Sequence, residues 1–215
     1  WYCHSLSVSD AKIREVVRGL VERGLAAHGW KYVNIDDSWQ GVRGGKFNAI
    51  QGNEAFPDMK ALGDYIHSLG LKFGLYSTPW ICSYAGFIGG SSDGGVEMEK
   101  AIPESERSRP TQFFGGWPRG REVGLYRTGH EWLFDNDVRQ WAEWGVDFVK
   151  VDWNPITAEV TERIADSLSR CGRDIVLSLS NSTPLESAPR LSKLAGMWRI
   201  SGDIRDTWES VRKIG

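Results

Sequence analysis

Residues 147–155 read Asp-Phe-Val-Lys-Val-Asp-Trp-Asn-Pro, and the predicted fold is arranged around them. Apolar and polar residues alternate along it and a closing Asn-Pro pair interrupts it, which predicts a short strand followed by a loop. The alternation places Phe148, Lys150 and Asp152 on one face and three apolar residues on the other. An ammonium and a carboxylate on one face of a buried strand are costly to desolvate unless they pair or contact a ligand. A structural ion pair and a ligand site therefore both remain open.

Helix and strand signals alternate on either side of this stretch. Further strands are predicted at residues 31–36, 71–77, 174–180 and 197–201, with a remnant of an earlier one at Trp1-Tyr2. Helices are predicted at about 10–25, 58–69, 131–144, 157–170, 184–194 and 207–214. Such alternation indicates parallel strands joined by right-handed crossovers, as in a barrel or a doubly wound sheet.

Two segments interrupt this alternation of strands and helices. Residues 41–53 are polar and rich in glycine, and we interpret them as a loop. A longer loop insertion is predicted at about 78–129, where the sequence indicates no long helix or strand. We expect it to cover one face of the domain, with Phe113, Phe114 and Trp117 as candidate walls of a binding cleft. An insertion that serves only packing or oligomer contacts is the alternative.

Polar residues stand at, or just beyond, the C-terminal ends of five predicted strands: Asp36, Asp37, Tyr76, Lys150, Asp152, Ser180, Arg199 and Asp203. Sites built from the ends of many strands are typical of a (β/α)8 TIM barrel, whereas a doubly wound sheet gathers its ligand groups at one switch point. A full barrel needs about 250 residues. We therefore expect an α/β fold with one domain over residues 1–215, a catalytic (β/α)8 barrel that is incomplete at its C-terminal and first-strand ends.

Composition narrows the classes of partner. A formal net charge of -2 over 215 residues gives no support for a nucleic acid or an anionic membrane surface. No apolar run reaches the length of a membrane span, and no signal peptide opens the chain. The 11 Trp and 25 Gly residues suit a pocket with flat aromatic walls, such as sugar rings require, although Trp also fills cores. We expect an extracellular or periplasmic location rather than a cytoplasmic one, and the oligomeric state stays open.

The residue types at the strand ends exclude some chemistries. No G-x-G-x-x-G motif follows a strand and no Walker loop is present, so nucleotide binding has little support. The histidines fall in predicted helices or loops, which disfavours a zinc hydrolase. A Schiff base on Lys150 is disfavoured because Asp152 would keep the amine protonated. A Mg²⁺ site made of Asp36, Asp37 and Asp152 remains the alternative that needs a metal.

A pair of carboxylates acting on an acetal fits the strand ends better. Glycoside hydrolysis needs one carboxylate at the anomeric carbon and another that protonates the leaving oxygen. Asp152 and Asp203 are candidates because each lies at a strand end, with Lys150 and Arg199 respectively upstream. A nearby cation keeps a nucleophilic carboxylate ionised. Under this hypothesis neither a cofactor nor a metal is required.

Five blocks of the sequence, in this order, resemble the catalytic barrel of glycoside hydrolase family 27, which contains α-galactosidases and α-N-acetylgalactosaminidases: residues 32–39, 56–58, 70–76, 147–152 and 198–208. The resemblance implies a retaining, exo-acting enzyme on a terminal α-linked sugar. It also implies that Asp152 is the nucleophile and Asp203 the acid/base, with Asp206 as the rival acid. The pocket residues implied around the sugar are Trp1, Asp36, Asp37, Tyr76, Lys150 and Arg199, to which we add Ser180 as a substrate-binding candidate.

Departures from the family pattern leave the sugar open. Animal and plant members carry a Cys after the Asp-Asp pair and another after the nucleophile, where this chain has Ser38 and Trp153-Asn154. Residues 178–184 lack the Cys-Glu-Trp pattern of galactose-type members. We expect an α-galactoside first, with an α-N-acetylgalactosaminide, an α-1,6-glucan or a β-L-arabinopyranoside as alternatives. A non-catalytic, carbohydrate-binding barrel remnant is the alternative from a different functional class.

Overall fold

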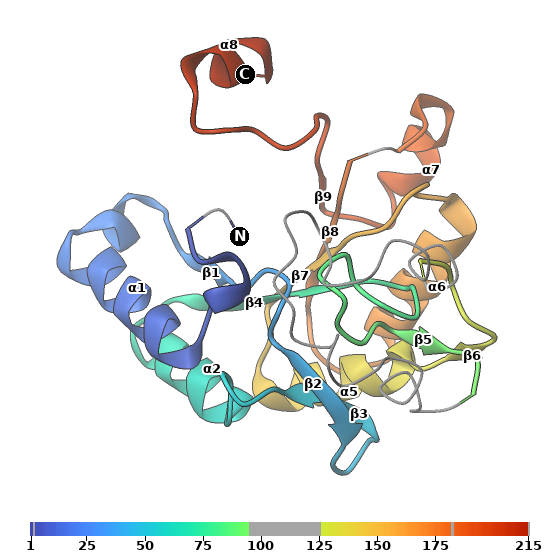
Figure 1. Ribbon diagram of the computed structural model, residues 1–215, viewed down its shortest axis with the longest axis horizontal. Helices are drawn as coiled ribbons and strands as arrows, with labels where there is room; N and C mark the ends of the chain where they lie inside the picture. Colours follow the sequence, from blue (N-terminus) through green and yellow to red (C-terminus); the bar gives the residue numbers. More distant parts are fainter. Residues whose placement is uncertain (2, 95–125, 182, 215) are drawn as a thin grey trace.

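A central sheet of five parallel strands organises the molecule (Figure 1). The computed structural model describes residues 1, 3–94, 126–181 and 183–214. In spatial order the strands are β1 (Tyr32–Asn34), β4 (Lys72–Ser77), β7 (Phe148–Val151), β8 (Val176–Leu179) and β9 (Met197–Trp198). Consecutive parallel strands joined through helices form a partial (β/α) barrel, which confirms the predicted fold class.

Helices precede, connect and follow the strands of the sheet. They are α1 (Asp10–Glu22), α2 (Met59–Ser68), α5 (Phe134–Trp144), α6 (Ala158–Ser169), α7 (Ala188–Leu191) and α8 (Trp208–Ile214). Helices α1, α2 and α6 are capped at their N-termini by the side chains of Ser9, Asp58 and Thr157. Each of these side chains accepts a hydrogen bond from a backbone N–H of the first helical turn, that of Lys12, Ala61 and Val160 respectively. Figure 1 shows α1, α2, α5 and α6 following one side of the arc of strands, whereas α8 stands apart on the other side.

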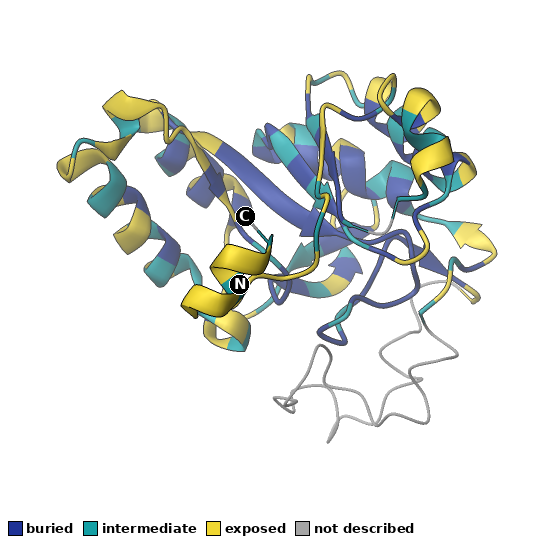
Figure 2. Ribbon diagram, turned by 90° about the horizontal axis from the view of Figure 1, so that it is seen from above, coloured by how far each residue is buried: buried dark blue, intermediate teal, exposed yellow. Residues whose placement is uncertain are grey.

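The predicted alternation along β7 is confirmed. Val149 and Val151 are fully buried, whereas Phe148 and Lys150 are half-buried on the opposite face. Figure 2 shows buried residues gathered along the sheet and exposed residues on the outer surfaces of the helices. One face of the sheet thus makes the apolar core against the helices, and the other is left to carry polar side chains.

The pairing register of the parallel strands places their C-terminal ends side by side. Tyr76 pairs with Lys150, and Lys150 pairs with Ser178. The ladder then continues beyond the strands, because the Asp152 N–H donates to Ser77 O at 2.9 Å and the Ser180 N–H donates to Val151 O at 3.2 Å. Groups from distant parts of the chain therefore meet at the C-terminal edge of the sheet.

The predicted loop at 41–53 is wrong. It contains an antiparallel hairpin, β2 (Gln40–Gly44) with β3 (Ala49–Gly52), and the pairing is irregular between Gln40 and Arg43. Its glycines concealed the strand pattern. Arg43 points inward from β2 and forms a fully buried ion pair with Asp137 of α5, at 2.6 Å from Nη1 to Oδ1. The hairpin is held by a polar contact that a purely apolar pattern does not reveal.

The insertion predicted at about 78–129 contains part of a second small sheet. Strand β5 (Ser91–Ser92) pairs antiparallel with β6 (Glu131–Trp132). The helix predicted at 131–144 therefore begins later, at Phe134, because Glu131 and Trp132 belong to β6. Residues 95–125 lie outside the described part of the chain. The predicted cleft walls Phe113, Phe114 and Trp117 belong to this range.

Three smaller boundaries also differ from the prediction. The strand predicted at 197–201 ends at Trp198, and the helix predicted at 184–194 consists of a 3-10 turn (Leu185–Ser187) followed by the short α7. Trp1 has no strand conformation, and its carbonyl accepts the Ser5 N–H in a turn, while Tyr2 lies outside the described residues. None of the described helices has the length and apolar character needed to cross a bilayer.

Candidate active site

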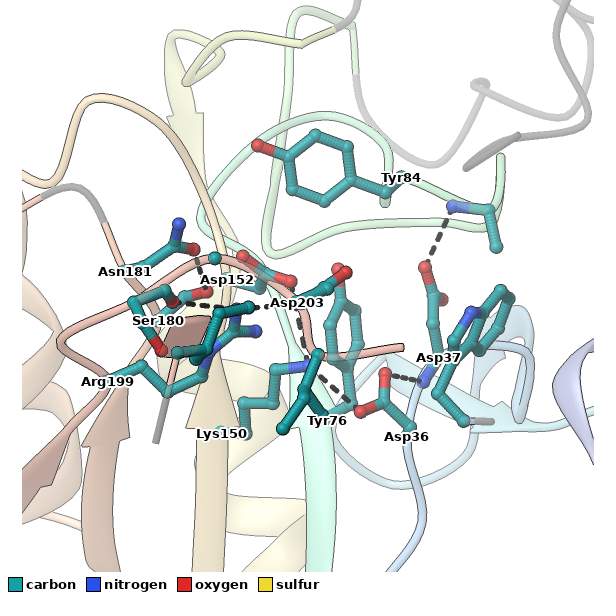
Figure 3. Close-up of a pocket in the computed structure, with 16 residues that line it drawn as sticks. Asp36, Asp37, Tyr76, Tyr84, Lys150, Asp152, Ser180, Asn181, Arg199 and Asp203 are labelled. Atoms are coloured by element: carbon teal, nitrogen blue, oxygen red, sulfur yellow. Dashed lines mark hydrogen bonds and ion pairs between the residues drawn. The ribbon is translucent and has the colours of Figure 1, made fainter. Parts of the chain in front are cut away.

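A pocket of about 710 Å³ opens at the C-terminal ends of the strands. This size lies within the range of roughly 300–1,000 Å³ that is usual for small-molecule sites. The pocket is lined by every site residue predicted from the sequence: Trp1, Asp36, Asp37, Tyr76, Lys150, Asp152, Ser180, Arg199 and Asp203. Figure 3 shows the labelled side chains of this set, all of them except Trp1, gathered above the ends of the strands. Asp206, the rival acid, is exposed and is not among the lining residues.

Two adjacent aspartates and a strained turn follow β1. Ser38 has a φ of 88°, in the left-handed region that side chains other than glycine rarely adopt. Asp36 turns toward the pocket, where its Oδ2 accepts from Lys150 Nζ at 2.9 Å. Asp37 turns into the protein, is almost fully buried, and accepts from Ser38 N, Gln40 Nε2 and Ala85 N. Burial raises the pKa of Asp37 to about 6, despite these donors.

Lys150 lies at the centre of the charges on the pocket floor. Its Nζ is 2.9 Å from Asp36 Oδ2, 3.7 Å from Asp152 Oδ2 and 5.0 Å from the centre of the Tyr76 ring. Burial works against the ammonium, but Asp36 and Asp152 outweigh it and raise the pKa of Lys150. Lys150 is therefore a permanent cation between two carboxylates.

The two carboxylates beside Lys150 are shifted in opposite directions. Burial would raise the pKa of Asp36, but its contact with Lys150 and the Asp37 N–H outweigh burial and lower that pKa. For Asp152 burial prevails and raises the pKa, because Lys150 is farther away, at 3.7 Å, and the favourable effects of Lys150 and of the Ser180 hydroxyl do not offset burial. Asp152 is thus less compensated than Asp36, which leaves it able to interact with an incoming ligand.

Asp203 reaches the same pocket from the loop after β9. Arg199 holds this loop in place, because its N–H donates to Leu179 O at 3.1 Å and extends the sheet pairing. Arg199 Nη2 lies 2.7 Å from Asp203 Oδ1 and also donates to the carbonyl of Ser201. About 38% of the Asp203 side chain is exposed, against 17% for Asp152. The pocket therefore holds one sheltered carboxylate and one that faces solvent.

Tyr76 contributes a buried polar group to the pocket. Its side chain is 1% exposed, and among the described residues its hydroxyl has no hydrogen-bond partner. Burial, together with Asp37, Asp152 and Asp36, raises the pKa of Tyr76 well above its ordinary value, so the phenol stays protonated. A buried donor of this kind is costly unless a ligand accepts its hydrogen bond.

Several lining residues were missed by sequence reasoning: Tyr84, Ala85, Asn181, Ser201, Gly202, Ile204 and Ile214. Asn181 and Gly202 directly follow predicted strands and Ser201 ends one, so a strand-end rule applied to every residue at these positions would have found them. Tyr84 and Ala85 lie inside the irregular segment after β4, where no periodicity marks them. The sequence also gave no indication that Asp37 binds the backbone of Ala85 rather than facing open solvent.

Comparisons with known proteins agree with this architecture. A sequence model of the Melibiase_2 family, described as alpha galactosidase A, matches residues 4–101 and 122–215. An alpha-galactosidase from Coffea arabica is 31% identical over 218 residues, which cover 98% of this chain and 47% of that protein. The chain thus spans about half the length of the curated relatives that it matches.

Solved structures give the same result for the fold. Alpha-galactosidase I from Mortierella vinacea has a TM-score of 0.70 at 24% identity, covering 96% of this chain and 45% of that one. A family 27 β-L-arabinopyranosidase from Geobacillus stearothermophilus has a TM-score of 0.63 at 28% identity, covering 96% and 52%. Because the family model matches most of the sequence and a relative above 30% identity covers nearly all of it, this chain belongs to glycoside hydrolase family 27, the alpha-galactosidase family.

Proposed function

We propose that this chain carries the catalytic pocket of a retaining, exo-acting α-glycoside hydrolase of the α-galactosidase kind. The observation that supports this most strongly is the presence of Asp152 and Asp203 in one pocket of about 710 Å³, although they are 51 residues apart (203 minus 152). Hydrolysis of a glycoside with retention uses two such carboxylates on opposite sides of the anomeric carbon.

Each carboxylate has surroundings that suit one role. Asp152 attacks the anomeric carbon and forms a covalent glycosyl-enzyme, while Asp203 donates a proton to the leaving oxygen. Asp203 then removes a proton from water, which attacks the anomeric carbon and releases Asp152 and the sugar. Partial desolvation of Asp152 suits a nucleophile, and the greater exposure of Asp203 suits a group that exchanges protons with water.

The polar groups around Asp152 would bind the hydroxyls of one terminal sugar. Asp36 and Lys150 provide charged hydrogen-bond partners, and the buried Tyr76 hydroxyl provides a neutral donor. Because these groups lie on the floor formed by the strand ends, the sugar would enter with its non-reducing end first. That orientation is the basis for proposing exo action.

The test compares three neutral variants on a panel of aryl glycosides. Asp152→Asn and Asp203→Asn should each lose at least about a hundredfold in kcat/KM on the best substrate of the wild-type protein. Asp206→Asn is the matched control, since Asp206 is exposed outside the pocket, and it should keep nearly full activity. Near-normal turnover by Asp152→Asn would refute the assignment, and loss of activity in Asp206→Asn alone would transfer the acid role to that residue.

The sugar is the part of the proposal with a specific rival. The Geobacillus neighbour is a β-L-arabinopyranosidase and is more similar in sequence than the Mortierella α-galactosidase, at 28% against 24% identity. The panel should therefore contain aryl α-galactosides, α-N-acetylgalactosaminides, α-glucosides and β-L-arabinopyranosides. A preference for the arabinopyranoside would keep the mechanism and change the substrate. Sugar binding by calorimetry without any hydrolysis would favour a non-catalytic carbohydrate-binding protein.

A further inference from the structure

Tyr84 stands on the opposite side of the pocket from the charged floor. It belongs to the irregular segment after β4 and lines the pocket together with Ala85. In Figure 3 its ring lies on the outward side of Asp152 and Asp203, whereas Lys150 and Tyr76 lie on the side of the strands. A molecule that reaches from the floor to solvent therefore passes this ring.

Contacts with two other aromatic rings hold the ring of Tyr84, and hydrogen bonds hold the backbone around it. It packs against Trp80 in an edge-to-face contact, with 5.2 Å between ring centres and 67° between planes, and against Tyr126 at 5.7 Å. Tyr126 Oη also donates to the carbonyl of Tyr84 at 3.2 Å. Next along the chain, the Ala85 N–H donates to the buried Asp37 at 2.8 Å. Tyr84 is thus a fixed surface, and fixed aromatic surfaces lose little conformational entropy when they bind.

The charge state of Tyr84 is compatible with a binding role. Burial first, and then the negative fields of Asp152 and Asp203, raise the pKa of Tyr84 to about 12. The phenol therefore stays neutral throughout the pH range in which a glycosidase works, and it adds no repulsion to the two carboxylates. What it offers to a ligand is a flat, neutral aromatic ring.

The chemistry of the pocket says which part of a substrate meets this ring. Under the proposed mechanism, the sugar that is cleaved occupies the floor, and the leaving oxygen lies beside Asp203. The group attached to that oxygen extends outward, toward Tyr84. We propose that Tyr84 is a specificity-determining residue that stacks on the second sugar of the substrate, so that the protein selects α-linked oligosaccharides over glycosides with a small leaving group. This inference rests on the proposed function.

Binding measurements test the inference apart from catalysis. The ligands are the free monosaccharide that the aryl panel identifies, or galactose if the panel shows no activity, and its sulfur-linked α-disaccharide, which is not cleaved. Wild-type protein should bind the disaccharide more tightly than the monosaccharide. Tyr84→Ala should weaken disaccharide binding by about tenfold and leave monosaccharide binding unchanged within about twofold.

Two further variants separate stacking from other roles. Tyr84→Phe keeps the ring and should retain the preference for the disaccharide. Tyr65→Ala, the same truncation in the outer helix α2, controls for damage to the fold. The inference is overturned if wild-type protein shows no preference for the disaccharide, if Tyr84→Ala weakens both ligands equally, or if Tyr84→Phe loses as much as Tyr84→Ala.

The proposed function fails by a different observation. If wild-type protein hydrolyses no glycoside of the panel but still prefers the disaccharide in a way that depends on Tyr84, the binding inference stands and the catalytic one falls. If hydrolysis is normal and no such preference exists, the reverse holds. The two outcomes are read from separate measurements on the same protein.

Discussion

Strand β7 carries an aspartate at each end, and the two differ in almost every respect. Asp147 precedes the strand and has partners for both oxygens: Arg173 at 2.7 Å on Oδ1, and His67 at 2.8 Å and the Phe73 N–H at 2.9 Å on Oδ2. Asp152 follows the strand, has its nearest cation, Lys150, at 3.7 Å, and lines the pocket. The carboxylate at the start of the strand thus has close partners for both oxygens, whereas the carboxylate at the end of the strand has no cation at hydrogen-bonding distance among the described residues.

Their pKa values follow this difference. Burial works against ionised Asp147, but His67, the Phe73 N–H and Arg173 outweigh it and lower the pKa. Burial raises the pKa of Asp152, because its partners do not compensate. A barrel strand therefore stabilises the fold at its N-terminal end and leaves reactive groups at its C-terminal end. The predictions below test that division.

The largest effect is expected from Asp152→Asn. Turnover should fall by about 10⁴-fold, because the neutral amide cannot form the covalent intermediate. The free energy of unfolding at pH 7 should not decrease, since the ionised carboxylate is disfavoured by burial in the folded protein. Enzyme kinetics and urea unfolding on the same sample check both statements. A large loss of stability would show that Asp152 is structural.

The reverse pattern is expected from Asp147→Asn. Removing the charge deprives Arg173 and His67 of their partner and should lower the free energy of unfolding by about 2–3 kcal/mol. Because Asp147 lies at the far end of the strand, kcat/KM at a temperature well below unfolding should change by less than about threefold. Urea unfolding and kinetics decide the outcome. Loss of activity with unchanged stability would break the division between the two ends.

Acidification should affect the two variants in opposite ways. For Asp147, whose pKa is lowered in the folded state, the stabilisation is present above the ordinary value of 3.8 and is lost as pH falls through the lowered pKa. For Asp152, whose pKa is raised, the wild-type protein loses stability relative to Asp152→Asn as pH rises above 3.8. At pH 7 wild type should thus be more stable than Asp147→Asn and less stable than Asp152→Asn, and both differences should shrink toward pH 3. Differences of equal sign would contradict this.

The smallest effect is expected from Ser180→Ala. The Ser180 hydroxyl donates to Asn181 Oδ1 at 3.2 Å and also favours ionised Asp152, so its loss should move the acidic limb of the kcat/KM profile to higher pH. The plateau value should fall by no more than about tenfold, as for one hydrogen bond. Ser178→Ala is the matched control, because Ser178 lies on the same face of β8 one step before the pocket. An unmoved limb in Ser180→Ala would remove Ser180 from this role.

Much of the fold was predictable because it follows the period of the backbone. All five strands of the main sheet and the helices between them were expected from alternating or helical spacing. The hairpin β2–β3 was not, since its glycines remove the side chains that mark a strand. The pairing of β5 with β6 was not either, because strands of two residues carry no period.

The pocket was predictable to the extent that its residues follow strands. Asp36, Lys150 and Arg199 stand at strand ends, and the parallel sheet places such positions together. Tyr84 reaches the pocket through tertiary contacts of an irregular segment, and no local pattern encodes such contacts. The different environments of Asp36 and Asp37 likewise depend on partners distant in the sequence, Lys150 for Asp36 and the Ala85 N–H for Asp37.

The buried pair of Arg43 and Asp137 has a practical consequence for redesign. Arg43 Nη2 also donates to the carbonyl of Gly89 at 2.7 Å, so the guanidinium fastens the far end of the segment that carries Tyr84. Gly89 admits no side chain, because a Cβ there would lie 2.0 Å from the Trp80 carbonyl oxygen. A mutant library that aims to change which oligosaccharides are accepted should therefore vary Tyr84 and leave Arg43, Gly89 and Asp137 untouched. Substrate selectivity could then be changed while the buried ion pair keeps the backbone of the segment that carries Tyr84 in place.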